Sequence, residues 1–291
     1  MRKRTLILVI LLTITGLSLL LYPTVSNYLK SLSFRRATDN YVAVVDPMDD
    51  QQIQELLDSA RAYNERLAVR GVGMLILSEE ERAEYNSLLD VDGSGIMGYV
   101  SVPKVNITLP IYHGTGDEAL QNGVGHLESS SLPVGGPDTH AVLSAHTGLP
   151  SAQLFTNIDQ LVEGDVFTLR VLKETLTYEV DQILVVLPDE TTALQVQPGE
   201  DYCTLVTCTP YGVNTHRLLV RGRRVPTPPQ GEAPAQPAIE TGGGLNAAPI
   251  LICLALGAAA TALVIFRKKQ MPKRAKRPAE KKETTPNPPE P

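Results

Sequence analysis

The sequence predicts a mainly β domain, an antiparallel sandwich or barrel, held between two membrane helices. Short β-rich runs separated by turn residues begin at Gly95, and two apolar runs lie near the ends of the 291-residue chain, each beside a basic cluster. The net charge of −6 combines +9 in these clusters with −15 elsewhere. The composition excludes a collagen, a disulfide scaffold and a wholly disordered chain, and the mild net charge gives no reason to expect nucleic-acid binding.

The first apolar run predicts an uncleaved membrane anchor at residues 5–22, after a basic head at residues 1–4. A helix of this length crosses most of a bilayer core, and Pro23 closes the apolar run. A signal peptide is the alternative, because a short basic head and an apolar run fit one too. No clear small-x-small cleavage site follows Leu21, which favours the anchor.

The second apolar run predicts a transmembrane helix at residues 247–266, because three basic residues follow it directly, as in a stop-transfer signal. A buried core helix is the alternative. It would have to lie between the Pro- and Gly-rich residues 226–246, which indicate a linker, and the basic tail 267–291, which is expected to be disordered.

Both basic clusters are expected in the cytoplasm, because Lys and Arg prefer that side of a membrane. The chain would then form a two-pass hairpin in the cell membrane, with both termini inside and residues 23–246 outside. The first basic residues of the tail would contact anionic lipid.

Two helices are predicted within residues 23–94. Apolar residues recur at three- and four-residue steps over 49–69, from Ile53 to Leu67, and give one apolar stripe. Ser78 and Glu81 have the spacing of a capping box, which predicts a second helix over Glu79–Leu89.

Seven strands are predicted in residues 95–225, where Gly, Pro, Asn and Asp fill the connections. The runs are Met97–Val102, Val105–Tyr112, Ala141–Ser144, Val166–Val171, Thr175–Val186, Tyr202–Cys208 and Thr215–Val225. About 130 residues suffice for a β core of this kind.

The three cysteines differ in their expected surroundings. Cys253 lies in the second apolar run. Cys203 and Cys208 lie an odd number of residues apart on one predicted strand and should face opposite sides, which argues against a mutual disulfide. Cys203 fits a buried packing residue, whereas Cys208 ends the strand and is the candidate for a reactive thiol.

A nucleophilic thiol needs a base or ion-pair partner and a group that stabilises an oxyanion. His146 follows the predicted strand Ala141–Ser144 at its exit into a loop, where catalytic groups often lie. Arg217 follows the turn after Cys208, so a hairpin would bring its guanidinium within reach of the sulfur and favour the thiolate. The alternative for Arg217 is a solvated strand arginine. No His or Cys pair has zinc spacing, and no metal or cofactor is expected.

Five segments together resemble the sortases, the transpeptidases of Gram-positive bacterial surfaces. Thr204-Leu205-Val206-Thr207-Cys208 matches the TLxTC signature, and Leu143–Gly148 is similar to the histidine motif. The other segments resemble the pilus-assembling class C members: Leu109–Gly114, Gly123–Leu127 and Thr207–Gly222. The resemblance covers roughly residues 95–225, and the two-anchor hairpin also matches class C.

The resemblance implies an eight-stranded sortase β-barrel, with an N-terminal helical extension, whose cleft holds Cys208, His146 and Arg217. Cys208 would be the nucleophile that carries the acyl thioester, His146 the proton donor and acceptor, and Arg217 the oxyanion stabiliser. The enzyme would cleave an LPxTG-like signal between Thr and Gly and join pilins through a lysine isopeptide bond. By resemblance, His113 and His126 are framework positions.

One departure from class C concerns the lid, since no Asp-Pro-aromatic motif lies in residues 70–94. Asp46-Pro47-Met48 precedes the first predicted helix and lacks the aromatic residue, and the apolar run Met74–Leu77 would cover the cleft or pack on the barrel.

The sequence leaves alternatives to this function. The nearest is a sortase that attaches surface proteins to peptidoglycan with the same catalytic residues. A non-catalytic membrane-tethered adhesion module is the alternative of another class. A papain-like hydrolase fits poorly, because there the cysteine precedes the histidine and begins a helix.

Overall fold

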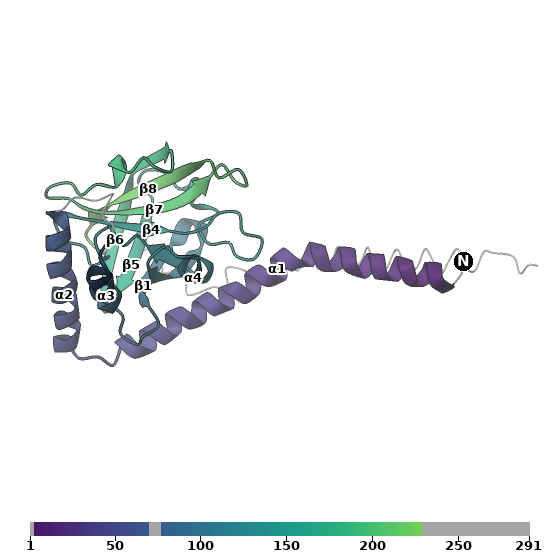
Figure 1. Cartoon of the computed structure of the whole chain (residues 1–291), viewed down its shortest axis with the longest axis horizontal. Helices are drawn as coiled ribbons and strands as arrows, with labels where there is room; N and C mark the ends of the chain where they lie inside the picture. The colour runs from purple at the N-terminus through teal and green to yellow at the C-terminus, as the bar shows by residue number, and fades with distance from the viewer. Residues whose placement is uncertain (1–2, 70–76, 229–291) are drawn as a thin grey trace, which may run out of the picture. The chain divides into compact units, whose positions relative to one another are not determined.

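The computed structural model describes residues 3–69 and 77–228 of the chain. Its described residues from Leu20 onward belong to one compact unit, and Lys3–Leu19 belong to another. The four α-helices of the described part are α1 Lys3–Val45, α2 Asp50–Ala68, α3 Glu79–Ser87 and α4 Asp117–Asn122 (Figure 1).

Eight strands close into a barrel in the order β1-β2-β3-β4-β7-β8-β6-β5. Their bounds are β1 Ile96–Val102, β2 Ile107–His113, β3 Val124–His126, β4 Thr139–Ser144, β5 Val166–Val171, β6 Glu174–Val186, β7 Asp201–Thr209 and β8 His216–Val225. All seven predicted strands are confirmed. Sequence reasoning missed β3, whose three residues are too short for a periodic signal, and the short helix α4 before it.

The expectation of a purely antiparallel sheet was wrong for two strand pairs. β2 pairs with β3 in parallel, and β4 pairs with β7 in parallel. Parallel neighbours need a crossover connection. The chain supplies one through α4 between β2 and β3, and a longer one through β5 and β6 between β4 and β7.

The barrel interior is filled by apolar side chains from every long strand, among them Val100, Leu169, Leu205 and Val220. Gly222 on β8 permits a close approach, because a Cβ atom there would lie 2.6 Å from the Phe167 ring. The Phe167 ring in turn stacks on Tyr178, with their centroids 5.6 Å apart. This tight interior fixes the register of the outer faces.

Pro23 closes the apolar run but not the helix, because α1 continues through Pro23 to Val45. Its second half is stabilised by packing, since Phe34, Thr38, Tyr41 and Val45 form a buried stripe at three- and four-residue steps. The Tyr41 hydroxyl donates to the carbonyl of Met97 (3.0 Å) and accepts from the Leu172 amide (2.7 Å). These contacts offset the backbone hydrogen bond that Pro23 removes.

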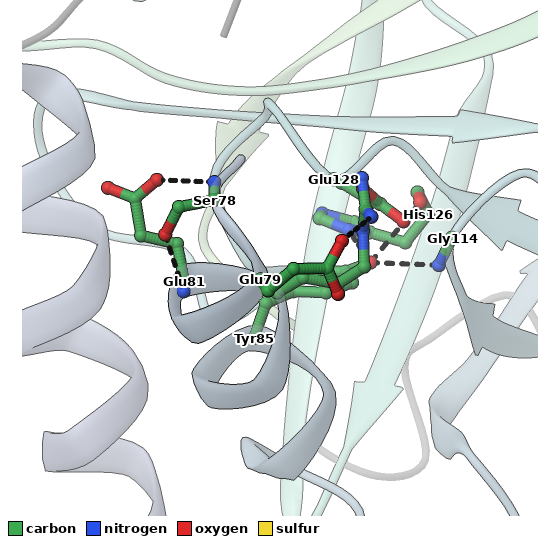
Figure 2. A network of polar contacts seen from close by, with 8 residues as sticks. Ser78, Glu79, Glu81, Tyr85, Gly114, His126 and Glu128 are labelled. Atoms are coloured by element: carbon green, nitrogen blue, oxygen red, sulfur yellow. Dashed lines mark hydrogen bonds and ion pairs between the residues drawn. The ribbon is translucent and has the colours of Figure 1, made fainter. Parts of the chain in front are cut away.

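The two predicted helices are confirmed as α2 and α3 (Figure 1). Each begins with a capping box, and Figure 2 shows that of α3, formed by Ser78 and Glu81. The Tyr85 ring on α3 is fully buried, and its hydroxyl lies 2.9 Å from His126 Nδ1 and 3.0 Å from the Gly114 amide nitrogen. Figure 2 shows Tyr85 reaching from α3 to these barrel groups. A single buried side chain therefore fixes α3 to the barrel.

Among the described residues, one helical stretch, Ile10–Val45, is long and apolar enough to cross a membrane. Its apolar residues near Leu19 are exposed, as lipid contact would require. The second predicted membrane helix at 247–266, Cys253 and the tail 267–291 lie outside the described residues, as do residues 74–76. Leu77 is described and buried.

Asp46-Pro47-Met48 forms the turn between α1 and α2, where the Asp46 and Met48 amides donate to carbonyls of the last turn of α1. Met48 packs against the core. This segment therefore joins two helices of the N-terminal extension.

Two buried histidines make the stability depend on pH. His126 Nε2 donates to the Ser131 carbonyl, and His140 Nδ1 donates to the Gln195 carbonyl, which fixes the nitrogen that carries the proton in each ring. Burial keeps both rings neutral at pH 7. Burial lowers the pKa of both imidazoles to about 4. In the unfolded chain they titrate near 6.5, so the unfolded state binds more protons between these values.

We expect stability to be highest above pH 6.5 and to fall as the pH drops towards 4, by about 2.5 kcal/mol for each histidine at pH 4.5. The melting temperature should then fall by roughly 10 °C between pH 7 and pH 4.5. His140→Gln should be less stable at pH 7 but show about half the pH dependence. A melting temperature that does not change over this range would contradict the assignment.

Candidate active site

The candidate site lies where three neighbouring strands, β4, β7 and β8, end or begin. In the parallel β4·β7 pair, Leu143 lies opposite Leu205 and Ser144 opposite Val206. The Ala145 amide extends this pairing by donating to the Val206 carbonyl (3.1 Å). Continued two residues past Ser144, the same register would set His146 opposite Cys208.

Cys208 is flanked on its other side by Arg217. The antiparallel β7·β8 pair places Cys208 directly opposite Arg217, and Thr209 opposite His216. This confirms the hairpin that the sequence predicts. The central strand therefore carries the thiol between a histidine and an arginine that lie far apart in the sequence.

The two cysteines of β7 lie in different environments, as their odd spacing predicts. Cys203 is fully buried with Leu205 in the barrel interior, whereas Cys208 is half-buried. Both are free thiols. Burial raises the pKa of the Cys203 thiol well above its ordinary value, so this thiol stays protonated and unreactive. The more accessible Cys208 is the candidate nucleophile.

The Arg217 guanidinium is held at the turn that precedes β8. Its Nη1 donates to the carbonyls of Asn214 (3.3 Å) and His216 (3.1 Å). A guanidinium has five N–H groups in a planar fork, so three more remain beyond these two bonds. An arginine oriented in this way beside a thiol can donate to an oxyanion that develops on a group bound to the sulfur.

His146 is half-buried and begins a loop whose ends are fixed by backbone contacts. Its carbonyl accepts from the Phe155 amide (3.1 Å). The residue before it is tied to β7, because the Thr207 hydroxyl donates to the Ala145 carbonyl (2.8 Å). Thr207 thus connects the residues that precede His146 and Cys208. Sequence reasoning gave Thr207 no role, although it lies in the TLxTC segment.

The other four histidines have side-chain hydrogen bonds away from Cys208. His126 and His140 are buried in the neutral forms described above, and His140 Nε2 lies 2.7 Å from the Thr204 hydroxyl. The His113 ring nitrogens lie 3.0 and 2.8 Å from two backbone carbonyl oxygens. His216 Nδ1 lies 2.9 Å from the Thr215 hydroxyl. His146 is thus the histidine that follows β4 at the end where Cys208 lies on the neighbouring strand β7.

A separate group of apolar side chains covers the outer face of the strands that carry the site. We call it the outer apolar cluster; its buried members are Val142, Leu194 and Leu219, and half-buried Leu127, Leu184, Val186, Ala193 and Val206 pack against them. Val206 lies two residues before Cys208 and Leu219 two after Arg217, so these residues share one face. This cluster was not predicted from the sequence. Apolar residues at strand positions that face outward could have indicated it.

Within residues 3–69 and 77–228, no group of three or more His, Cys, Asp or Glu side chains is placed to hold a metal ion. The side chains of Cys208, His146 and Arg217 offer the site a thiol, an imidazole and a guanidinium.

Comparisons with known proteins agree with this geometry. A family model, the sortase domain, matches residues 100–225. The chain is 31% identical to Sortase D of Bacillus subtilis over 131 aligned residues. The alignment covers 44% of this chain and 63% of that relative. The chain thus spans less than two thirds of that curated sortase, and 51% of Sortase A of Streptococcus agalactiae.

Solved structures of sortases match more completely. Sortase C1 of Streptococcus agalactiae is 51% identical to this chain and superposes with a TM-score of 0.65. The match covers 66% of this chain and 100% of the sortase C1 chain. Streptococcus pneumoniae sortase C is 43% identical with a TM-score of 0.60, over 66% and 97% of the two chains. Clostridium perfringens sortase C, solved with a C-terminal cell wall sorting motif, is 43% identical with a TM-score of 0.57, over 66% and 99%. The chain belongs to the sortase family, and these structural neighbours are its class C members.

Proposed function

We propose that this protein is a membrane-anchored cysteine transpeptidase that cleaves an LPxTG-like sorting signal between Thr and Gly and joins pilin subunits through lysine. The observation that carries the proposal is the pairing of β7 with β4 and β8, which sets Cys208 opposite Arg217 and ends two residues before His146. The sortase domain match over residues 100–225 supports it. Each of the three side chains then has one role.

In the first half-reaction, the Cys208 thiolate attacks the carbonyl carbon of the substrate Thr. The Arg217 guanidinium donates hydrogen bonds to the oxyanion that forms. As the C–N bond to Gly breaks, the His146 imidazolium protonates the departing amine. The products are a thioester on Cys208 and a peptide that begins with Gly.

In the second half-reaction, a lysine amine of another pilin attacks the thioester carbon. His146, now neutral, takes the proton from the amine, and Arg217 again stabilises the oxyanion. The C–S bond breaks, the Cys208 thiolate is restored and an isopeptide bond is formed. Water as the acceptor would give hydrolysis instead.

The outer apolar cluster supports a substrate with apolar residues before the cleaved bond. Half-buried Val206 lies two residues before Cys208, and half-buried Val186 pairs with Arg217, so the Leu and Pro of an LPxTG-like segment would bury apolar area there. The Clostridium perfringens neighbour was solved with a sorting motif, and the Streptococcus pneumoniae structure concerns pilin substrate specificity. The first favours a sorting signal as substrate, and the second favours a pilin as the protein that carries it.

The acceptor distinguishes this proposal from its nearest alternative, attachment to peptidoglycan. The proposed location is the cell membrane, with α1 as one anchor and residues 247–266 as a second, and the barrel on the outer side. Incubation of the full chain in detergent with a candidate pilin, followed by mass spectrometry of crosslinked peptides, tests the proposal. An isopeptide bond between two pilins supports it, and a product joined only to a cell-wall amine favours the alternative.

Cys208→Ala should abolish both cleavage of the sorting signal and pilin polymers, because no other group in the site can form the thioester. The barrel should remain folded, since Cys208 is not part of the interior. Gel electrophoresis of pilin products and the melting temperature measure the two effects. Polymers formed by this variant alone would show that the nucleophile is misassigned. Failure of an LPxTG-mimicking vinyl sulfone to label Cys208 in the unsubstituted protein would favour an adhesion module.

Arg217→Lys should lower kcat by roughly 10²–10³-fold, because lysine cannot supply the planar fork to the oxyanion. Arg223→Lys is the matched control on the same face of β8, where Arg223 pairs with Glu200 (2.8 Å) instead. Its kcat should stay within about twofold of the unsubstituted value. Steady-state kinetics with a fluorogenic sorting peptide measure both. Equal kcat values for the two variants would contradict the oxyanion role of Arg217.

A further inference from the structure

We infer that Asn27 on α1 is a positioning residue for His146, so that the membrane-anchoring helix itself holds the catalytic loop in place. The inference rests on the proposed function and extends it to a residue outside the sortase domain match. It follows from the contacts of the loop 146–156, which runs from the end of β4 towards the 3₁₀ turn Ile158–Gln160.

The base of this loop is closed by two hydrogen bonds. The Phe155 amide donates to the His146 carbonyl (3.1 Å), and the Gly148 amide donates to the Thr156 hydroxyl (3.1 Å). On its inner side Ala152, Leu154 and Phe155 are buried in the barrel core. The loop is therefore one packed unit, and a displacement of its tip would be transmitted to His146.

The tip of the loop contacts α1. The Gln153 amide donates to the Asn27 side-chain oxygen (2.8 Å), and the Ser26 hydroxyl lies 3.4 Å from the Ser151 carbonyl oxygen. Asn27 is half-buried, 126 residues from Gln153 in the sequence. The Asn27 side chain thereby accepts the hydrogen bond of the Gln153 amide, which has its acceptor outside the loop.

Asn27 is placed by the rest of α1. It lies seven residues before Phe34, so it belongs to the same helix face as the buried stripe that ends at Val45. Tyr41 fixes that stripe to the barrel through its two hydrogen bonds. Tyr41 and Asn27 are about 21 Å apart along the helix axis. The helix, fixed to the barrel at Tyr41, therefore carries the Asn27 oxygen to the Gln153 amide.

Loss of this contact should affect proton transfer more than substrate binding. A displacement of about 1 Å of a catalytic group can cost up to about 10²-fold in rate. The outer apolar cluster lies on other elements of the barrel and does not include residues of the loop. We therefore expect kcat to fall while KM stays nearly constant.

The test compares three variants of the full chain in detergent micelles. Asn27→Leu removes the acceptor at similar volume, whereas Asn27→Asp keeps an acceptor oxygen. Lys30→Leu is the matched control, because Lys30 Nζ donates to the Gln121 carbonyl (3.2 Å) near α4 and not to the loop. With a fluorogenic sorting peptide, Asn27→Leu should lower kcat about tenfold with KM within twofold. The other two variants should stay within twofold in kcat.

Hydrogen–deuterium exchange gives a second readout that needs no turnover. Peptides that contain Gln153 should exchange faster in Asn27→Leu and at the unsubstituted rate in Asn27→Asp and Lys30→Leu. Unchanged exchange at Gln153 in Asn27→Leu, or an equal loss of kcat in Lys30→Leu, would overturn the inference. A protein that cleaves no sorting peptide while exchange responds as expected would refute the proposed function and leave the loop contact established.

Discussion

The pairing of β7 between β4 and β8 is the constraint on which the rest of the site depends. β7 is parallel to β4 and antiparallel to β8, so the ends of β4 and β7 and the start of β8 meet at one edge of the barrel. A one-residue slip in either pair would turn Cys208 or its neighbour to the opposite face. The Thr207 hydroxyl secures the parallel pair at its open end through the Ala145 carbonyl.

The same pairing separates the two thiols of one strand. Residues that point inward, Cys203 among them, complete the barrel core, and burial keeps that thiol protonated. Residues that point outward carry the chemistry and the outer apolar cluster. Strand alternation alone therefore assigns one cysteine to packing and places the other beside an arginine. The glycine at position 222 lets the interior close tightly enough to hold this arrangement.

Much of the fold and of the candidate site could be predicted from the sequence, because its signals are local. The seven β-rich runs, the capping box of Ser78 and Glu81, and the odd spacing of Cys203 and Cys208 are local patterns. The parallel β4·β7 pair was not predicted, because parallel pairing joins segments far apart in the chain. The course of α1 through Pro23 was missed because packing of Tyr41 and its neighbours, not local propensity, stabilises it. Thr207 and Asn27 were missed for a similar reason, since each acts on a backbone group of a distant segment.

α1 connects the barrel to the membrane-anchoring part of the chain, and its contact with the loop of His146 makes it part of the site. The central claim is that Cys208 forms a thioester with the sorting signal beside His146 and Arg217. The most direct test is acid quenching of the full chain during turnover of an LPxTG-like peptide, followed by peptide mapping. The account predicts an acyl adduct on Cys208 that hydroxylamine removes. Cleavage that proceeds without an adduct, or with one on another residue, would contradict it.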